Sequence, residues 1–439
     1  MGDLYDILSV VDTFYIQETD MNKKILPRHP LGNPRRKWKQ DNFILSTFSV
    51  RAKDMEKSIR NCKEVGFNTV ELGWAESWQC ADAVRYCEEY GLDLIYQNLD
   101  RFGGMQGYRR YKKNELGSTI NELKEKKCIV GYYIWDEPFY DDQLEETRSL
   151  VDECEQNAPD KLPFAVAIPS YNTDFTWKNG LFTEYLEKYV TVIDPPILSL
   201  DYYPVGTPEH NETVQFDKSP MWCDLGLMKK LGEKYDMPIW FYYQGLNHHN
   251  VDFFIFPMVR SMMYAGALYG VKGLQHFSTC GSIITENGDK DIFFEDQKAI
   301  HAEFENLGNT LMALTCKRVI HDPTVDPECD DFAGLHNTVE DSEFLTESLP
   351  KRISVSEFED EHNNKYMMIL NRDYMTETHL TLPLNGSYRI YEVSKADGNQ
   401  KMIIDSTSYL SVTLAAGDAV LYRIQKSCDD AFTIEYQLS

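Results

Sequence analysis

The 439-residue sequence predicts an α/β protein in which a (β/α)8 barrel of the TIM type is followed by an antiparallel β-sandwich. Three observations carry this prediction. From about residue 42, apolar runs alternate with amphipathic segments, which indicates parallel strands covered by helices. Eight such units occupy about 270 residues, which matches one barrel in number and size. After Thr315 apolar residues recur at every second position, which is typical of antiparallel strands.

Eight runs rich in branched and aromatic residues are the expected barrel strands. They span residues 42–50, 67–74, 92–98, 129–135, 163–170, 197–205, 238–245 and 273–281. Helix-like segments lie between them at 52–65, 78–90, 141–157, 221–235, 252–269 and 293–315, while the links after the third and fifth strands show no clear pattern. An open doubly wound sheet is the alternative. The first strand continues as "FSVRAKD", without the glycine-rich phosphate loop of such sheets, and this favours the barrel.

An Asp- and Pro-bearing linker, "HDPTVDPECDD" at 321–331, marks the change of pattern. Short alternating runs follow it at 352–358, 365–373, 378–384, 387–393, 409–414 and 419–424. Turn residues divide them, as in a β-sandwich. We therefore expect a lead segment over 1–41, a barrel over 42–318 and a sandwich over 319–439, and we expect no catalytic group in the sandwich.

Composition narrows the classes of partner. The formal net charge of −26 argues against nucleic acid, because binding to phosphates needs a concentrated basic face. The 27 Tyr and 7 Trp residues suit the binding of flat polar ligands, although they also fill a large core. The apolar stretch 253–271 contains Pro257, Arg260 and an Ala-Gly-Ala run, so we expect a helix packed closely on the sheet and no membrane span.

Cysteine spacing and the first residues bear on the compartment. The ten cysteines form no framework and no CxxC pair, which predicts reduced core thiols and no structural zinc. The opening "MGDLYDILSV" lacks the basic and small-residue features of a signal peptide.

Polar and aromatic residues gather where the predicted strands end. In a barrel these ends meet at one mouth, where the chemistry of this fold is carried out. Carboxylates, amides and aromatic rings at such a mouth suit glycoside chemistry: acids protonate or attack, amides bind hydroxyls, and rings stack on sugar faces. The candidate residues are Glu71, Trp74, Asn98, Trp135, Asp136, Glu137, Asp201, Tyr203, Tyr243, Gln244 and His276. Of these, we expect Glu71, Glu137, Asp201, Gln244 and His276 to face a single cleft.

Two motifs resemble a known group of enzymes. The run "YYIWDEP" at 132–138 resembles the fourth-strand acid/base motif of clan A glycoside hydrolases, where Asn-Glu-Pro is usual. The tail, "NRD" at 371–373 and "LPLNGSYRIYEVS" at 382–394, resembles the sandwich that follows the barrel in many β-galactosidase-like glycosidases. The resemblance extends over roughly residues 42–425 and is nearest to uncharacterised glycoside hydrolases of Bacteroidetes. It implies a periplasmic or secreted protein, although the sequence shows no signal peptide.

The resemblance implies that Glu137 is the general acid and that Asp136 replaces the sugar-contacting asparagine. Burial beside Trp135 and the tyrosines would raise the pKa of the Glu137 carboxyl, and an ionised Asp136 would raise it further. A structural alternative stays open: Glu137 can be a helix N-terminal carboxylate, with Pro138 in the first turn.

Strand seven departs from the family pattern. Clan A enzymes carry a nucleophilic Glu at its end, whereas "PIWFYYQGLNHH" at 238–249 offers Tyr243 and Gln244. We expect the second carboxylate elsewhere, with Asp201 as the first candidate and Glu71 as the next. It would activate water in an inverting mechanism or attack directly in a retaining one.

The leading prediction is therefore a glycoside hydrolase acting on an oligo- or polysaccharide, with no cofactor. A carbohydrate-binding protein on a disarmed glycosidase barrel is the alternative that Gln244 favours. A metal-dependent sugar isomerase comes third, since His248 and His249 lie near the acids but no metal-ligand spacing is present. The sugar, the linkage, the stereochemistry and the oligomeric state stay open.

Overall fold

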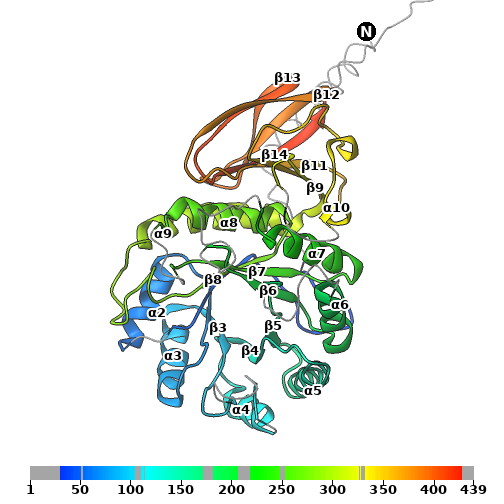
Figure 1. Ribbon diagram of the computed structural model, residues 1–439. Helices are drawn as coiled ribbons and strands as arrows, with labels where there is room; N and C mark the ends of the chain where they lie inside the picture. The colour runs from blue at the N-terminus through cyan, green and yellow to red at the C-terminus, as the bar shows by residue number, and fades with distance from the viewer. Residues whose placement is uncertain are drawn as a thin grey trace, which may run out of the picture.

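The computed structural model describes residues 30–50, 53–103, 110–112, 114–171, 181–205, 218–247, 253–325, 327 and 332–427. Figure 1 shows a ring of strands surrounded by helices, with a second, antiparallel sheet stacked against one side of it. The predicted fold class, a (β/α)8 barrel followed by an antiparallel β-sandwich, is confirmed.

The barrel strands are all parallel. They are β1 (Ile44–Phe48), β2 (Thr69–Glu71), β3 (Asp93–Tyr96), β4 (Ile129–Asp136), β5 (Leu162–Val166), β6 (Leu198–Tyr202), β7 (Ile239–Gln244) and β8 (Gly273–Phe277). Neighbours in the ring follow the chain, and β8 returns to lie beside β1. The ring closes between β5 and β6, where the Ala167 backbone N–H donates to the Ser199 carbonyl at 2.8 Å.

Helices cover the outside of the ring (Figure 1). They are α2 (Met55–Glu64), α3 (Ser77–Tyr90), α4 (Glu115–Leu123), α5 (Asp141–Asn157), α6 (Leu181–Lys188), α7 (Met221–Lys234), α8 (Phe256–Leu268) and α9 (Phe294–Ala313), and a π-helical turn, η3 (Tyr189–Ile193), extends α6. Helices α4 and α6 occupy the two links that the sequence left unassigned. They have nine and eight residues, which is too short for a clear helical period.

Helix α8 lies between the barrel and the second sheet (Figure 1). A Cβ atom on Gly266 would come 3.0 Å from Leu274 and 3.2 Å from Phe241, so the close packing predicted from the Ala-Gly-Ala run is confirmed. Pro257 lies in the first turn of the helix, where a missing N–H costs nothing. Among the described residues no helix is long and apolar enough to cross a bilayer.

The second sheet is antiparallel, with strand order β13-β12-β14-β11-β10-β9. Its strands are β9 (Thr315–His321), β10 (Ile353–Glu359), β11 (Lys365–Asn371), β12 (Thr378–Val393), β13 (Gln400–Leu414) and β14 (Ala419–Lys426); α10 (Phe332–Leu335) and a 3-10 turn, η6 (Val339–Asp341), precede β10. The two runs expected at 378–384 and 387–393 form one strand, β12, because the chain absorbs the residues between them as a register shift after Pro383.

The two faces of this sheet have different roles. Ile353, Ile369 and Leu382 belong to a core that the sheet builds for itself. Met368 and Leu421 instead join the hydrophobic core of the barrel. The sandwich is therefore packed on the barrel through shared apolar residues.

Most of the described cysteines are free thiols in the interior of the protein. Seven described cysteines are free, and all but Cys280 are buried, as expected for core thiols. Cys223 is disulfide-bonded, which corrects the expectation of fully reduced thiols.

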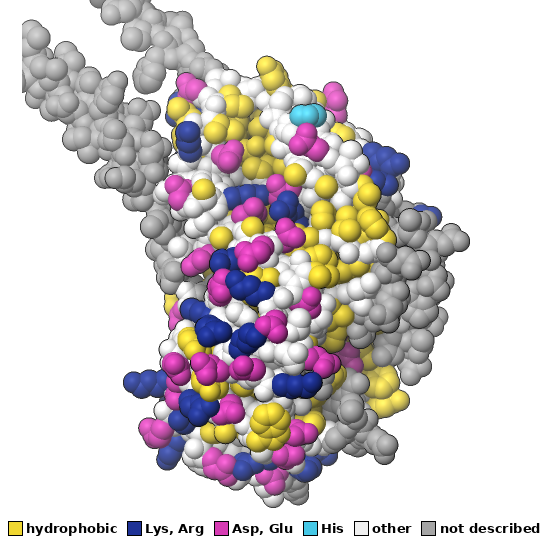
Figure 2. Space-filling view, turned by 90° about the vertical axis from the view of Figure 1, so that its left-hand side faces the viewer, with side chains coloured by type: hydrophobic (Ala, Val, Ile, Leu, Met, Phe, Trp, Pro, Cys, Tyr) yellow, Lys and Arg dark blue, Asp and Glu magenta, His cyan; other side chains and the backbone are white. Residues whose placement is uncertain are grey.

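On the face drawn in Figure 2, acidic and basic side chains are interspersed and form no broad basic area.

Candidate active site

The carboxyl ends of the strands bring four of the predicted acids to one end of the barrel. Glu71 ends β2, Asp136 ends β4 and is followed by Glu137, and Asp201 lies near the end of β6.

Glu71 is enclosed inside the ring. Its side chain is 0% exposed and accepts hydrogen bonds from Ser46 Oγ at 2.6 Å, from Gln275 Nε2 at 2.9 Å and from the Tyr242 hydroxyl. Burial raises the pKa of the Glu71 carboxyl, while these three donors oppose the rise. Residues from β1, β2, β7 and β8 thus share one buried network of hydrogen bonds, which links these four strands inside the barrel.

Asp136 belongs to a second tyrosine–carboxylate pair. The Tyr133 hydroxyl donates to Asp136 Oδ1 at 3.0 Å, and Asp136 is nearly buried. Burial, followed by the charges of Asp136, Glu71 and Asp201, raises the pKa of Tyr133 well above its ordinary value. The hydroxyl of Tyr133 therefore lies within the electrostatic reach of three acids from three strands.

Glu137 has a left-handed backbone, with φ of 55°. Such a conformation in a residue other than glycine costs on the order of 1–3 kcal/mol and persists only where neighbours hold it. The Glu137 N–H donates to the Val166 carbonyl at 3.2 Å, and the next carbonyl, that of Pro138, accepts from the Tyr185 hydroxyl at 3.0 Å. Helix α6 and strand β5 thus both hold the turn that carries Glu137, whose side chain is partly exposed.

Glu137 and Asp201 face the same group of tyrosines. Burial raises the pKa values of Tyr171, Tyr185 and Tyr203, and the charges of both acids raise each of them further. Asp201 is also hydrogen-bonded to Tyr203. Both predicted catalytic acids, Glu137 after β4 and Asp201 in β6, therefore lie within electrostatic range of these three tyrosines.

An arc of aromatic rings lies next to these acids. Phe48 at the end of β1 meets Trp74 edge-on, with ring centroids 5.4 Å apart, and stacks on Phe277 at 5.8 Å. Phe277 in turn stacks on Tyr203 at 4.7 Å. Trp74 and Phe277 are partly exposed. Flat, partly exposed rings of this kind can pack against the apolar face of a sugar.

Tyr243 and His276 point away from the barrel axis. Both are 0% exposed, and the Tyr243 hydroxyl accepts from Gln297 of α9 at 3.0 Å. The His276 ring packs edge-on to Tyr243 and Phe67, and burial lowers its pKa to about 3. Successive residues of a strand alternate in direction, so their neighbours Tyr242 and Gln275 are the ones that face the interior.

Trp135 and Asn98 are also occupied by protein contacts. Trp135 is 1% exposed and lies under the Arg110 guanidinium, 5.5 Å from the ring centroid. Asn98 is nearly buried; its amide exchanges hydrogen bonds with Ser77, at 3.1 and 3.2 Å, and accepts from the Asp100 N–H. The structure therefore places both residues in the walls of the mouth.

Gln244 links the ends of two strands. Its amide oxygen accepts from the Val205 N–H at 2.8 Å, and its amide nitrogen donates to the Val205 carbonyl at 3.0 Å and to the Leu246 carbonyl at 3.2 Å. A glutamate could not donate to those carbonyls. The backbone around the end of β7 thus needs an amide at position 244, because only an amide both accepts from the N–H and donates to the carbonyls.

Several contributors lay outside the predicted set. Three of them, Tyr133, Phe48 and Phe277, lie on strands and point into the barrel, as Asp201 and Gln275 do. Because side chains along a strand point alternately inward and outward, this alternation could have identified them from the sequence. Tyr185 comes from α6 and carries no strand-end signal. His248 and His249 lie outside the described residues. Within the described ranges, no three His, Cys, Asp or Glu side chains converge as a metal site.

Two cavities bounded by described residues lie at the opposite end of the barrel. One, of about 230 Å³, adjoins the N-terminal ends of β7 and β8, and the other, of about 360 Å³, adjoins those of β1 to β3. Neither is lined by any of the predicted acids. The chemistry of the mouth and the volume of these cavities therefore belong to different places in the fold.

No protein-family model and no curated protein sequence matches this chain. Solved structures do. A protein of Bacteroides fragilis proposed to be an alpha-galactosidase is 9% identical over 88% of this chain and 80% of its own, with a TM-score of 0.52. A GH30 endoxylanase of Clostridium papyrosolvens is 9% identical, with coverage of 91% and 97% and a TM-score of 0.44. A GH27 β-L-arabinopyranosidase of Geobacillus stearothermophilus is 11% identical, with coverage of 88% and 97% and a TM-score of 0.43. At 9% identity, the likeness to the first of these structures shows a shared fold.

Proposed function

We propose that this chain is a glycoside hydrolase that cleaves an oligo- or polysaccharide at the carboxyl ends of its barrel strands. One observation carries the proposal: Glu137, directly after β4, and Asp201, near the end of β6, lie at the carboxyl ends of strands in the same barrel. Two carboxyls around one space are what hydrolysis of an acetal requires. The name of the alpha-galactosidase-like neighbour, which has a comparable fold, points to the same class of reaction.

In this proposal Glu137 is the general acid. It would donate its proton to the glycosidic oxygen as the bond to the leaving group breaks. The turn held by Val166 and Tyr185 would keep the carboxyl aimed at one point.

Asp201 is the second carboxylate of the proposal. If it attacks the anomeric carbon, the two carboxyls need a separation of about 5–5.5 Å and the product retains its configuration; if it activates water, the separation is about 6.5–9.5 Å and the configuration inverts. Tyr203, hydrogen-bonded to Asp201, would orient it. The two routes can be distinguished by the anomeric configuration of the first product and by trapping of a covalent glycosyl-enzyme, which only the retaining route forms.

Binding of the sugar falls to residues of the mouth that have partly exposed or polar surface. Trp74 would stack on the ring, and Asp136 would accept from a hydroxyl. Glu71, Gln244 and Asn98 would support the site from behind through the hydrogen bonds described above. Trp135, Tyr243 and His276 would act only through packing.

A carbohydrate-binding protein without hydrolysis is the second candidate. It is favoured by the amide at the end of β7, where a nucleophilic acid is usual in clan A enzymes. The two candidates make the same prediction for binding and opposite predictions for bond cleavage.

The deciding experiment screens a panel of plant and host glycans for released reducing ends. Wild type and the double variant Glu137→Gln/Asp201→Asn are compared on each glycan, and binding is followed by calorimetry. Reducing ends released by wild type alone support the hydrolase. Binding by both proteins without release by either would establish the binding protein instead.

A further inference from the structure

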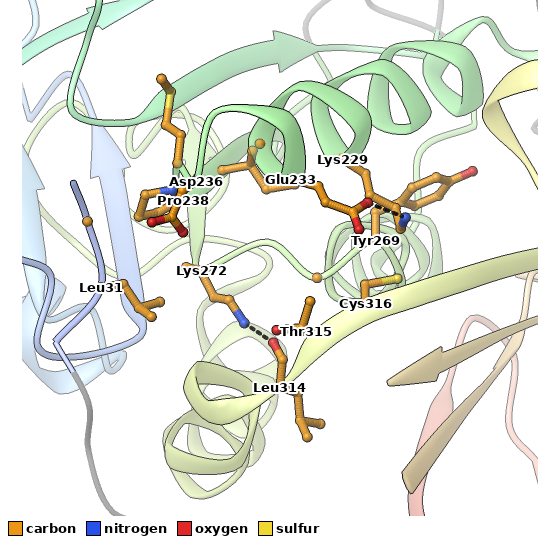
Figure 3. Close-up of a pocket in the computed structure, with 15 residues that line it drawn as sticks. Leu31, Lys229, Glu233, Asp236, Pro238, Tyr269, Lys272, Leu314, Thr315 and Cys316 are labelled. Atoms are coloured by element: carbon orange, nitrogen blue, oxygen red, sulfur yellow. Dashed lines mark hydrogen bonds and ion pairs between the residues drawn. The ribbon is translucent and has the colours of Figure 1, made fainter. Parts of the chain in front are cut away.

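Exposed apolar side chains of the barrel gather at the end that carries the predicted acids. Among the described residues of the barrel, six large hydrophobic side chains are exposed, and five of them follow the carboxyl ends of strands: Trp78, Tyr140, Leu181, Phe253 and Ile292. The sixth, Val192, lies at the opposite end, before β6. The cavity drawn in Figure 3 is also at that opposite end, and its aromatic lining residue, Tyr269, is 1% exposed. Exposed apolar residues scattered singly are ordinary, but their concentration at one end indicates an interaction surface.

Trp78 presents an anchored ring on this surface. It lies in the first turn of α3 and is 57% exposed, and its indole N–H donates to Glu76 Oε2 at 2.7 Å. Glu76 is the residue before the helix, and its own N–H donates to Gln79 Oε1 at 3.1 Å. Because the ring is already held at its polar edge, less conformational freedom is lost when it stacks on a ligand.

Tyr140 presents a second ring, beyond the end of β4. It lies at the start of α5, three residues after Glu137, and is 55% exposed. The Phe139 ring packs on it with centroids 3.9 Å apart, and the Tyr140 N–H donates to Gln143 Oε1 at 3.2 Å. The Tyr140 ring is therefore continuous along the chain with the turn that carries the proposed general acid.

Polar groups occupy the surface between the two rings. Strand β3 lies between β2 and β4, and helix α4 lies between α3 and α5 (Figure 1). On the loop after β3, Asp100 accepts from Ser77 Oγ at 2.5 Å, and Arg101 forms an ion pair with Glu122 at 2.7 Å. Glu76, Asp100 and Glu122 outnumber Arg101 here, which favours a neutral ligand over a polyanion.

The spacing of the strands sets the size of the ligand. At about 4.8 Å for each step between strands, the ends of β2 and β4 are roughly 10 Å apart. A ligand that touches both rings therefore has to contain several sugar units. A protein partner would instead bury a continuous apolar core, whereas the two rings are separated by polar groups.

We propose that Trp78 and Tyr140 form outer subsites for a neutral polysaccharide that crosses the mouth from α3 to α5. The inference rests on the proposed function, because it assigns the substrate of the same site to the polymeric class. Each ring stacks on the apolar face of a sugar unit, while Asp100 accepts from hydroxyl groups of the chain between them.

The test measures binding as a function of chain length. The probes are galactomannan, arabinoxylan and xyloglucan, which are neutral, with oligosaccharides of increasing length cut from each, and polygalacturonate as a polyanion. Wild-type affinity for a bound neutral glycan should rise with length, and polygalacturonate should bind most weakly. Trp78→Ala and Tyr140→Ala should each weaken binding of the polymer by about 2- to 10-fold, and the double variant by about the product, because the rings lie on separate helices. The loss should be smaller on the shortest oligosaccharides.

Two further variants serve as controls. Tyr409→Ala removes a ring that is 58% exposed on β13 of the second sheet, and this variant should bind every probe as wild type does. Trp78→Phe keeps a ring at the same position and should recover part of the affinity that Trp78→Ala loses.

The outcomes separate this inference from the proposed hydrolysis. Affinity that does not depend on length, equal affinity in wild type and the double variant, tighter binding of polygalacturonate, or no binding of any polymer would overturn the inference. Release of sugar from short glycosides would then still support the hydrolase. Length-dependent binding that the double variant loses, without release of reducing ends by wild type, would uphold the inference and reject hydrolysis.

Discussion

The Tyr185 hydroxyl donates to the Pro138 carbonyl at 3.0 Å and accepts from the Ile168 N–H at 3.0 Å, so that one side chain of α6 joins the ends of β4 and β5. Through this bond a helix on the outside of the barrel controls the backbone of the proposed acid. Tyr185 is buried, with 3% of its surface exposed.

Tyr185→Phe should therefore weaken catalysis through Glu137. Loss of the hydroxyl leaves a buried N–H and a carbonyl without this partner, at a cost of about 1–3 kcal/mol. We expect a lower kcat with KM nearly unchanged, and a shift of the high-pH limb of the pH profile of kcat, where a general acid loses its proton. If melting temperature falls while the pH profile stays the same, Tyr185 is a stabilising residue only.

Glu137→Gln should make the rate depend strongly on the leaving group. General acid catalysis contributes about 10²–10⁴-fold, so cleavage of a glycoside with a poor leaving group should fall by that order. A dinitrophenyl glycoside needs little protonation and should be affected much less. The control is Asp136→Asn, which keeps the acceptor for Tyr133 and should weaken binding without this dependence. Equal losses on both substrates would contradict the acid role of Glu137.

Gln244→Glu should destabilise the protein and create no nucleophile. The new carboxylate would face the carbonyls of Val205 and Leu246 in place of two donated hydrogen bonds. We expect a loss of roughly 1–3 kcal/mol in the free energy of unfolding, measured by urea denaturation. Gln244→Met, which removes the bonds without adding charge, should lose less. A gain in hydrolysis from the glutamate would show that the end of β7 is a vacant catalytic position.

Glu71→Gln should change how stability varies with pH. The pKa of Glu71 is raised in the folded protein, so ionisation of this group disfavours folding. Its contribution is fully present below the unfolded pKa of about 4.3 and is lost as pH rises through the raised value. The free energy of unfolding of the variant, relative to wild type, should therefore increase from pH 4 to pH 7. A constant difference would mean that Glu71 titrates as it does in the unfolded chain.

His276→Leu should reduce the sensitivity of the protein to acid. Within the part of the chain that the structure describes, neither ring nitrogen of His276 has a side-chain hydrogen-bond partner, and burial lowers its pKa to about 3. The stability that comes from keeping it neutral is full above about pH 6.5 and is lost as pH falls toward 3. The variant should match wild type at pH 7 and exceed it at pH 4. His301→Leu is the contrasting control, because His301 bonds to Val65 O and Gln297 and should be needed at pH 7.

The sequence was sufficient for the architecture, because period and order are local properties. Apolar runs alternating with helices predicted the ring, and period-2 runs predicted the second sheet. It also placed Glu137 and Asp201 at strand ends, where the structure has them.

Side-chain direction was harder to predict than strand position. A shift of one residue reverses the face, so Tyr243 and His276 lie outside the ring whereas Tyr242 and Gln275 lie inside it. Tyr185 escaped notice because it reaches the site from a helix, through a contact that exists only after the chain has folded.

The turn at Gly417 has a consequence for how the protein is made. A Cβ atom there would come 2.3 Å from the Pro257 carbonyl, so the last hairpin closes directly on the start of α8. Leu421, beyond that turn, fills the same apolar interior as the barrel. During synthesis, all eight barrel strands therefore leave the ribosome before Leu421, which completes the packing of the barrel core, has been made. We therefore expect the barrel to need the last hairpin for its full stability, and a chain truncated within β14 to expose α8 to chaperones and proteases.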